Sequence, residues 1–118
     1  MKRIILLLTS FLLIGFNCLA EKSFTFFQDC TLTEKQINGE ELTNWKDMHG
    51  STSCLSYVKG FRDALDLSNT IGVKKICLDR FSTGQIIIKI LNFARENPDQ
   101  LSKPRGFLLY YALSKYKC

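Results

Sequence analysis

The sequence lacks most of what an enzyme needs. Its 118 residues contain one histidine, His49, and two prolines. No zinc-protease motif, no serine–histidine–aspartate order and no glycine-rich phosphate loop occurs in it. Asp63 and Asp66 are spaced for one helix, but as a pair of carboxylates they fit a solvated surface better than a catalytic site. We therefore expect no enzyme activity and no cofactor.

Long apolar runs are also missing, apart from one at the N-terminus. A basic start, Met1-Lys2-Arg3, is followed by uncharged residues up to Phe16 and by small residues at Cys18 and Ala20. This is the layout of a secretory signal peptide cleaved after Ala20. An uncleaved anchor fits less well, because a membrane-spanning helix needs about 20 apolar residues. A lipoprotein acylated at Cys18 is a second alternative, disfavoured by the bulky residue at Phe16. We expect residues 1–20 to direct export to the periplasm, with no membrane attachment after cleavage.

Runs of positive charge are absent from the rest of the chain. Without residues 1–20, 14 basic residues accompany 11 acidic ones, a net charge of +3. These charges are scattered, and Lys74-Lys75 is the one basic dipeptide. A nucleic-acid-binding protein would concentrate lysine and arginine on one face. The pattern indicates an ordinary, mildly basic surface and no nucleic acid partner.

The cysteines predict disulfides rather than a metal site. Cleavage after Ala20 leaves four of the five, Cys30, Cys54, Cys77 and Cys118. An even number in a small exported chain predicts two disulfides, because the periplasm is oxidising. Zinc ligands usually come in close pairs, whereas the nearest two of these cysteines are 23 positions apart. Four cysteines allow three connectivities. Three consecutive antiparallel helices would place Cys118 beside Cys77 and leave Cys30 to meet Cys54, which is the pairing we expect.

The apolar spacing from Cys54 onward predicts a helix. Apolar residues recur there every three or four positions, as on one face of a helix. Ser51 or Ser53 would cap its start, and Ser68-Asn69 and Gly72 would end it. Gly60, in its middle, predicts that another backbone packs closely against it.

A second helix is predicted between Ser82 and Asn97-Pro98. Ser82 and Gln85 have the spacing of a capping box, and the isoleucine-rich stretch 86–94 follows. Three consecutive isoleucines also suit a buried strand, but the length, the capping box and the closing Asn-Pro favour a helix. Because this helix is apolar nearly all round, we expect it to be central, or partly covered by a second copy of the chain in a homodimer.

The two ends of the mature chain complete the prediction. Pro104 suits the first turn of a last helix running to Cys118. Its apolar face would consist of Phe107, Leu108, Tyr111, Ala112 and Leu113. Residues 21–30, with three phenylalanines, would form a short helix or an irregular packed segment, and residues 31–53 are polar, with turns at Asn38-Gly39 and His49-Gly50. The expected fold is one all-α domain over residues 21–118, a small, disulfide-stapled antiparallel helical bundle.

Several of these residues form a joint pattern. Residues 54–64 spell C-x-x-Y-x-x-G-x-x-D-A, and further matching elements are Phe26-Phe27-Gln28-Asp29-Cys30, Cys77, Thr83-Gly84-Gln85-Ile86, Asn97-Pro98 and Tyr111-Ala112-Leu113 with Cys118. Together they resemble the Rap/Tai family of immunity proteins of type VI secretion. The chain departs from that family at Leu78-Asp79-Arg80, where proline is frequent, and at Tyr116-Lys117, where Phe-Pro is usual.

The resemblance implies a function and a partner. Family members are periplasmic, all-helical proteins, broadly similar to the acid-stress chaperone HdeA. They bind peptidoglycan amidase toxins delivered by neighbouring cells, occlude the active-site cleft and are often homodimers. The resemblance therefore implies a secreted peptidoglycan amidase effector as the partner. The matched residues Tyr57, Gly60, Asp63 and Pro98, with the four cysteines, are expected to determine the fold rather than contact the toxin.

The contacting surface is expected where loops allow variation, in residues 38–49. Candidate residues are Asn38, Trp45, Asp47 and His49, with Trp45 as the anchor because tryptophan is enriched at binding hot spots. Alternatively, Trp45 folds back onto the core and its neighbours form a solvated rim. The competing function is an HdeA-like periplasmic chaperone, or a structural domain without an enzyme partner. Two disulfides and a single histidine argue against acid-triggered unfolding of that kind.

Overall fold

The computed structural model describes residues 22–72 and 75–118, so the predicted signal peptide lies outside the described residues. The helices are α2 (Ser23–Ile37), α3 (Trp45–Thr70), α4 (Thr83–Glu96), the 3-10 helix η1 (Pro98–Ser102) and α5 (Arg105–Leu113). Within the described ranges the chain forms no strand, only two isolated bridges. The prediction of an all-α fold is confirmed. None of the described helices is both long and apolar enough to cross a bilayer.

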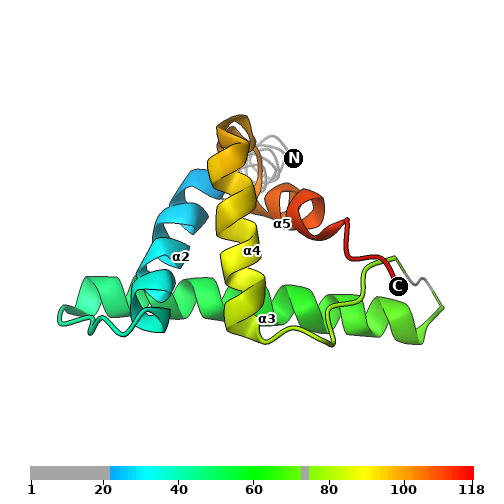
Figure 1. The fold of residues 1–118 in the computed structure, drawn as a ribbon, viewed down its shortest axis with the longest axis horizontal. Coiled ribbons are helices and arrows are strands. Elements are labelled where there is room, and N and C mark those ends of the chain that lie inside the picture. Colours follow the sequence, from blue (N-terminus) through cyan, green and yellow to red (C-terminus); the bar gives the residue numbers. More distant parts are fainter. Residues whose placement is uncertain (1–21, 73–74) are drawn as a thin grey trace, which may run out of the picture.

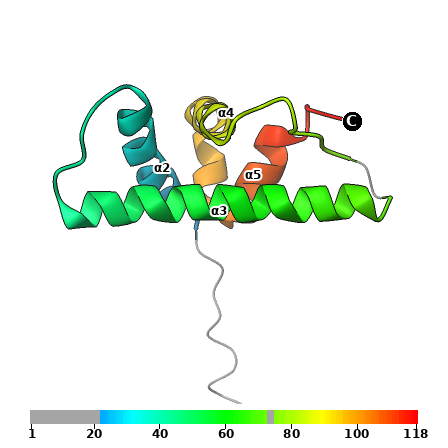
Figure 2. The same cartoon turned by 90° about the horizontal axis from the view of Figure 1, so that it is seen from below.

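The long helix α3 is the base of the molecule. Figures 1 and 2 show α2, α4 and α5 on the same side of α3, with α4 between the other two. The core lies where these three helices meet α3, and α4 supplies much of it. Its buried residues are Ile86, Ile87, Ile90, Leu91 and Ala94.

Local signals define α4 as the sequence predicted. The Ser82 hydroxyl accepts a hydrogen bond from the Gln85 backbone N–H (3.2 Å), and the Gln85 side chain accepts one from the Ser82 N–H (2.9 Å). The helix ends at Glu96, with Asn97 as its C-cap before Pro98. The helical prediction is confirmed and the strand alternative was wrong. Because α2, α3, α5 and η1 of the same chain all pack against α4, its apolar character has an explanation within one chain, and homodimerisation stays a prediction.

Both expected disulfides form. Cys30 in α2 is bonded to Cys54 in α3, with Cα atoms 5.1 Å apart, and both residues are fully buried. Cys77 is bonded to Cys118, with Cα atoms 5.0 Å apart. The first bond joins two helices inside the core, whereas the second ties the C-terminal segment to the connection between α3 and α4.

The helix α3 begins earlier than predicted. Asn44 is its N-cap: the side chain accepts a hydrogen bond from the Asp47 N–H and donates one to the Asp47 carboxylate, both at 2.9 Å. The predicted cap at Ser51 or Ser53 and the turn at His49-Gly50 were therefore wrong. Ser51 is buried instead and hydrogen-bonds Thr33 of α2. The polar residues of this stretch form a helix because Asn44 caps its N-terminus and because Ser51 packs against α2.

The close backbone approach predicted at Gly60 is absent, and a close contact with side chains occurs at Gly50 instead. A β-carbon on Gly60 would meet nothing within 4 Å, so that prediction was wrong. A β-carbon on Gly50 would lie 2.8 Å from side-chain atoms of Asp29 and Leu32 in α2. Gly50 lies one turn before Cys54, where the disulfide holds the two helices together. The small residue therefore allows the helix contact at Gly50.

The first helix is fastened at its start to the segment before α5. Residues 21–30, for which a helix and an irregular segment were both open, are helical from Ser23. The backbone N–H and the hydroxyl of Ser23 both donate to the Lys103 carbonyl, at 2.9 and 2.6 Å. Phe26 is buried, whereas Phe24 is 53% exposed. Only one of the three phenylalanines is therefore fully part of the core.

An ion pair joins α2 to α4. The two terminal guanidinium nitrogens of Arg95, Nη1 and Nη2, donate to the Glu34 carboxylate, at 3.0 and 2.5 Å. These hydrogen bonds lower the pKa of Glu34; burial raises it, and the charge of Arg95 lowers it further. The ionised Glu34 carboxylate therefore stabilises the folded state.

We expect Glu34→Gln to lower the free energy of unfolding by at most about 1 kcal/mol at neutral pH, because the pair is partly exposed. A carboxyl whose pKa is lower in the folded state contributes stability above its unfolded pKa and loses it as the pH falls through the folded pKa. The difference from wild type should therefore shrink below about pH 4. Urea denaturation at several pH values measures this, with the exposed Glu41→Gln as control. A difference independent of pH would contradict it.

Candidate functional site

An aromatic groove lies between α3 and α5. Its volume is about 640 Å³, and Tyr57 and Phe61 of α3 face Phe107, Tyr110 and Tyr111 of α5 across it. Pro104, Arg105 and Gly106 complete the lining, which contains no carboxylate. We call this feature the aromatic groove.

The groove exists because α5 is apolar on two sides. Its buried side consists of Leu108, Leu109, Ala112 and Leu113. On the other side, Phe107, Tyr110 and Tyr111 are 53%, 46% and 47% exposed. The predicted inward face was therefore wrong for Phe107 and Tyr111 and omitted Leu109. The helix also ends at Leu113 and not at Cys118. Exposed aromatic residues gathered on one helix face, rather than scattered singly, are typical of an interaction surface.

The rings in the groove are held by one another and by cations. The Phe107 and Tyr111 rings are stacked with centroids 6.5 Å apart, and Tyr110 meets Tyr111 edge-on at 5.7 Å. The Arg105 guanidinium carbon lies 3.8 Å from the centroid of the Tyr57 ring. Tyr57 also packs edge-on against the buried Phe26, with centroids 5.3 Å apart. One wall of the groove is thus anchored in the core, as a preformed binding surface requires.

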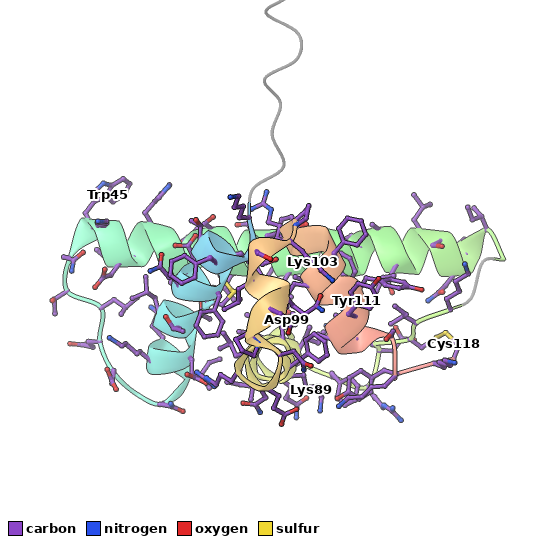
Figure 3. The ribbon with its side chains drawn as sticks, turned by 90° about the horizontal axis from the view of Figure 1, so that it is seen from above. Trp45, Lys89, Asp99, Lys103, Tyr111 and Cys118 are labelled. Carbon is purple, nitrogen blue, oxygen red and sulfur yellow. A yellow bond between two sulfur atoms is a disulfide. The ribbon has the colours of Figure 1, made fainter. Side chains whose placement is uncertain are left out.

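The residues predicted to bind a partner do not lie at this groove. Figure 3 shows Trp45 and Cys118 at opposite ends of the molecule, with Tyr111 on the side of Cys118. Trp45 is the first residue of α3 and is 76% exposed, so the alternative in which it folds back onto the core was wrong. Its ring lies 5.6 Å from the His49 ring.

The other two candidates have local structural roles. Asp47 is held by the N-cap Asn44. Asn38 is the C-cap of α2, and its N–H donates to the Glu34 carbonyl at 3.0 Å. Of the four predicted contact residues, the structure brings only Trp45 and His49 together. Contact with a partner stays a prediction for all four.

Of the residues expected to determine the fold, some have a visible structural role and others are exposed on the surface. Tyr57 packs between Phe26 and Arg105, and Pro98 opens η1. Gly60 and Asp63 are exposed on α3. A structural role is therefore visible for Tyr57 and Pro98, while the roles of Gly60 and Asp63 stay predictions. Among the described residues, no group of three His, Cys, Asp or Glu side chains is arranged to hold a metal ion.

Comparison with protein families identifies the chain. Residues 23–118, which include every described helix, match the Rap1a immunity proteins. The chain belongs to this family. Membership in the Rap1a family implies a secreted effector as the binding partner. Searches of curated proteins and of solved structures found no match, so the expected likeness to HdeA has no support.

The aromatic groove of this Rap1a immunity protein was not predicted from the sequence. The signal was the composition of residues 105–113, which contain more apolar side chains than one face of a short helix can bury. Tyrosine and arginine, both present here, are enriched at binding hot spots.

Proposed function

We propose that this chain is exported to the periplasm, where it binds a peptidoglycan amidase delivered by type VI secretion and blocks the active site of that enzyme. Its membership in the Rap1a immunity family supports the role of an effector inhibitor. Two disulfides favour an oxidising compartment. Inhibition of this kind requires a complementary surface and no catalytic group, so we propose no enzyme activity.

The aromatic groove is the structural feature that best supports binding to an effector. Protein interfaces have an apolar, aromatic centre surrounded by a polar rim. Phe107 and Tyr111 provide such a centre, with Lys103 and Arg105 beside it: the Lys103 amine lies 5.7 Å from the Tyr111 ring centroid. We therefore place the effector contact on the α3–α5 side of the molecule and not at Trp45.

A protection assay tests the function. A candidate peptidoglycan amidase effector is directed to the periplasm of a host cell, together with this chain carrying or lacking residues 1–20. We expect the full chain to prevent lysis and the shortened chain to give no protection. Lysis in the presence of the exported chain would contradict inhibition, and protection by the shortened chain would contradict the periplasmic site of action.

A further inference from the structure

Basic residues that are scattered in the sequence gather around one ring at the C-terminal end. Residues 75–81 and 115–118 lie side by side there, as the course of the chain near the C-terminus in Figure 1 shows. An isolated bridge pairs Ile76 with Lys117, the Cys77 N–H donates to the Tyr116 carbonyl (3.0 Å), and the Cys77–Cys118 disulfide closes the junction. Fold and disulfide together thus create a local charge density that the sequence does not show.

The ring at the centre of this junction is Tyr116. It meets the Phe81 ring edge-on, with centroids 5.0 Å apart. The Lys89 amine lies 5.0 Å from the Tyr116 centroid, the Lys115 amine 5.4 Å and the Arg80 guanidinium carbon 5.9 Å. Cation–π contacts of this kind hold the positive groups in place without neutralising them. We call these three residues, together with Lys75 and Lys117 of the two paired segments, the basic end.

No side chain of the basic end forms an ion pair with a carboxylate of the described residues. Asp79 shares a small hollow with Arg80 and Lys117. Within the described ranges, however, the Arg95–Glu34 pair is the ion pair that forms, and no carboxylate lies within 4.0 Å of a charged nitrogen of the basic end. Like charges held together without partners repel one another and attract an anionic group.

The basic end is continuous with the aromatic groove. A second hollow, of about 690 Å³, runs from Tyr110 and Tyr111 to Lys75, Lys115 and Lys117. The same two tyrosines line the aromatic groove. A protein bound at the aromatic groove would therefore also contact these lysines, which would form the charged rim of the interface.

We propose that the basic end is the electrostatic rim of the effector interface and binds an acidic segment of the effector, whose carboxylates lie between Arg80, Lys115 and Lys117. This inference rests on the proposed function and names the chemistry of the partner's contacting segment. An acidic protein is favoured over a nucleic acid or a lipid surface because the charges form a compact group beside an aromatic groove rather than a stripe along the molecule. Charges at a rim act mainly on the rate of association.

The test is the association rate of the full mature chain with the amidase, measured by stopped-flow at about 10 mM and about 1 M NaCl, where the Debye length falls from about 30 Å to about 3 Å. The variant is Lys115→Glu/Lys117→Glu. Its control is Lys35→Glu/Lys46→Glu, the same charge change at exposed residues of α2 and α3. We expect the first variant to associate at least about tenfold more slowly at low salt, with the difference mostly lost at high salt. The control should change the rate less than about threefold.

Three kinds of result in this experiment would overturn the proposal. Equal effects of the two variants, or a salt-independent difference, overturn the proposal while the wild-type chain still binds. Loss of binding to vesicles of phosphatidylglycerol in the first variant, with unchanged association with the amidase, assigns the basic end to membranes instead and also overturns it. If the wild-type chain does not bind the amidase at all, the proposed function fails, and this inference fails with it. Thermal unfolding followed by circular dichroism verifies that both variants are folded.

Discussion

Removal of the Cys30–Cys54 disulfide, by Cys30→Ala/Cys54→Ala, is expected to destabilise the protein by about 3–4 kcal/mol or more. Chain entropy alone predicts about 3–4 kcal/mol for a bond that joins residues 24 positions apart. Both cysteines are fully buried where α2 meets α3, so the truncation also leaves a cavity. A domain of this size is typically stable by about 5–15 kcal/mol, and the variant should unfold at a much lower urea concentration.

The matched control is Cys77→Ala/Cys118→Ala, which removes a bond between residues 41 positions apart. If chain entropy alone acted, this change would cost slightly more than the first. We expect it to cost less, because Cys118 is exposed and the segment after α5 regains freedom in the folded state when the bond is lost. Urea denaturation without reductant compares the two. An equal or larger loss of unfolding free energy in the control would mean that burial of the Cys30–Cys54 bond does not add to stability.

The second large effect is expected at the aromatic groove. Phe107→Ala/Tyr111→Ala should weaken binding to the effector by at least about 30-fold, which corresponds to about 2 kcal/mol, the usual size of a hot spot. Both side chains are about half exposed on the outer side of α5, so their removal should change the free energy of unfolding little. Isothermal titration with the amidase measures the affinity.

Trp45→Ala is the matched control for the groove variant. Trp45 is larger and more exposed, but it lies at the other end of the molecule. We expect its removal to change the affinity less than about threefold. A larger loss for Trp45→Ala than for the groove variant would return the contact to residues 38–49 and remove the groove from the interface.

The parts of the fold that the sequence predicted correctly depend on short-range chemistry. The helix α4 has a capping box at Ser82 and Gln85 and an Asn-Pro stop, both of which act within a few residues. The disulfide pairing followed from the parity of the cysteines and from the order of the helices. The capping box and the Asn-Pro stop need no knowledge of distant contacts, whereas the disulfide pairing also used an expected packing of the helices.

What the sequence did not predict depends on tertiary contacts. Residues 45–53 contain few apolar side chains, and their helix depends on the Asn44 cap and on packing of Ser51 and Gly50 against α2. The orientation of α5 was missed because a helix that is apolar all round does not reveal which side faces the core. The basic end was missed because its residues are separated in the sequence and are gathered by a bridge and a disulfide.

Hydrogen–deuterium exchange of the complex with the amidase locates the effector contact on this protein. We expect the amides of residues 105–113 to exchange more slowly when the amidase is bound, with further protection at residues 57–61 and 115–118. Exchange in residues 38–49 should stay unchanged. Protection confined to residues 38–49, with α5 exchanging as in the free protein, would contradict the account.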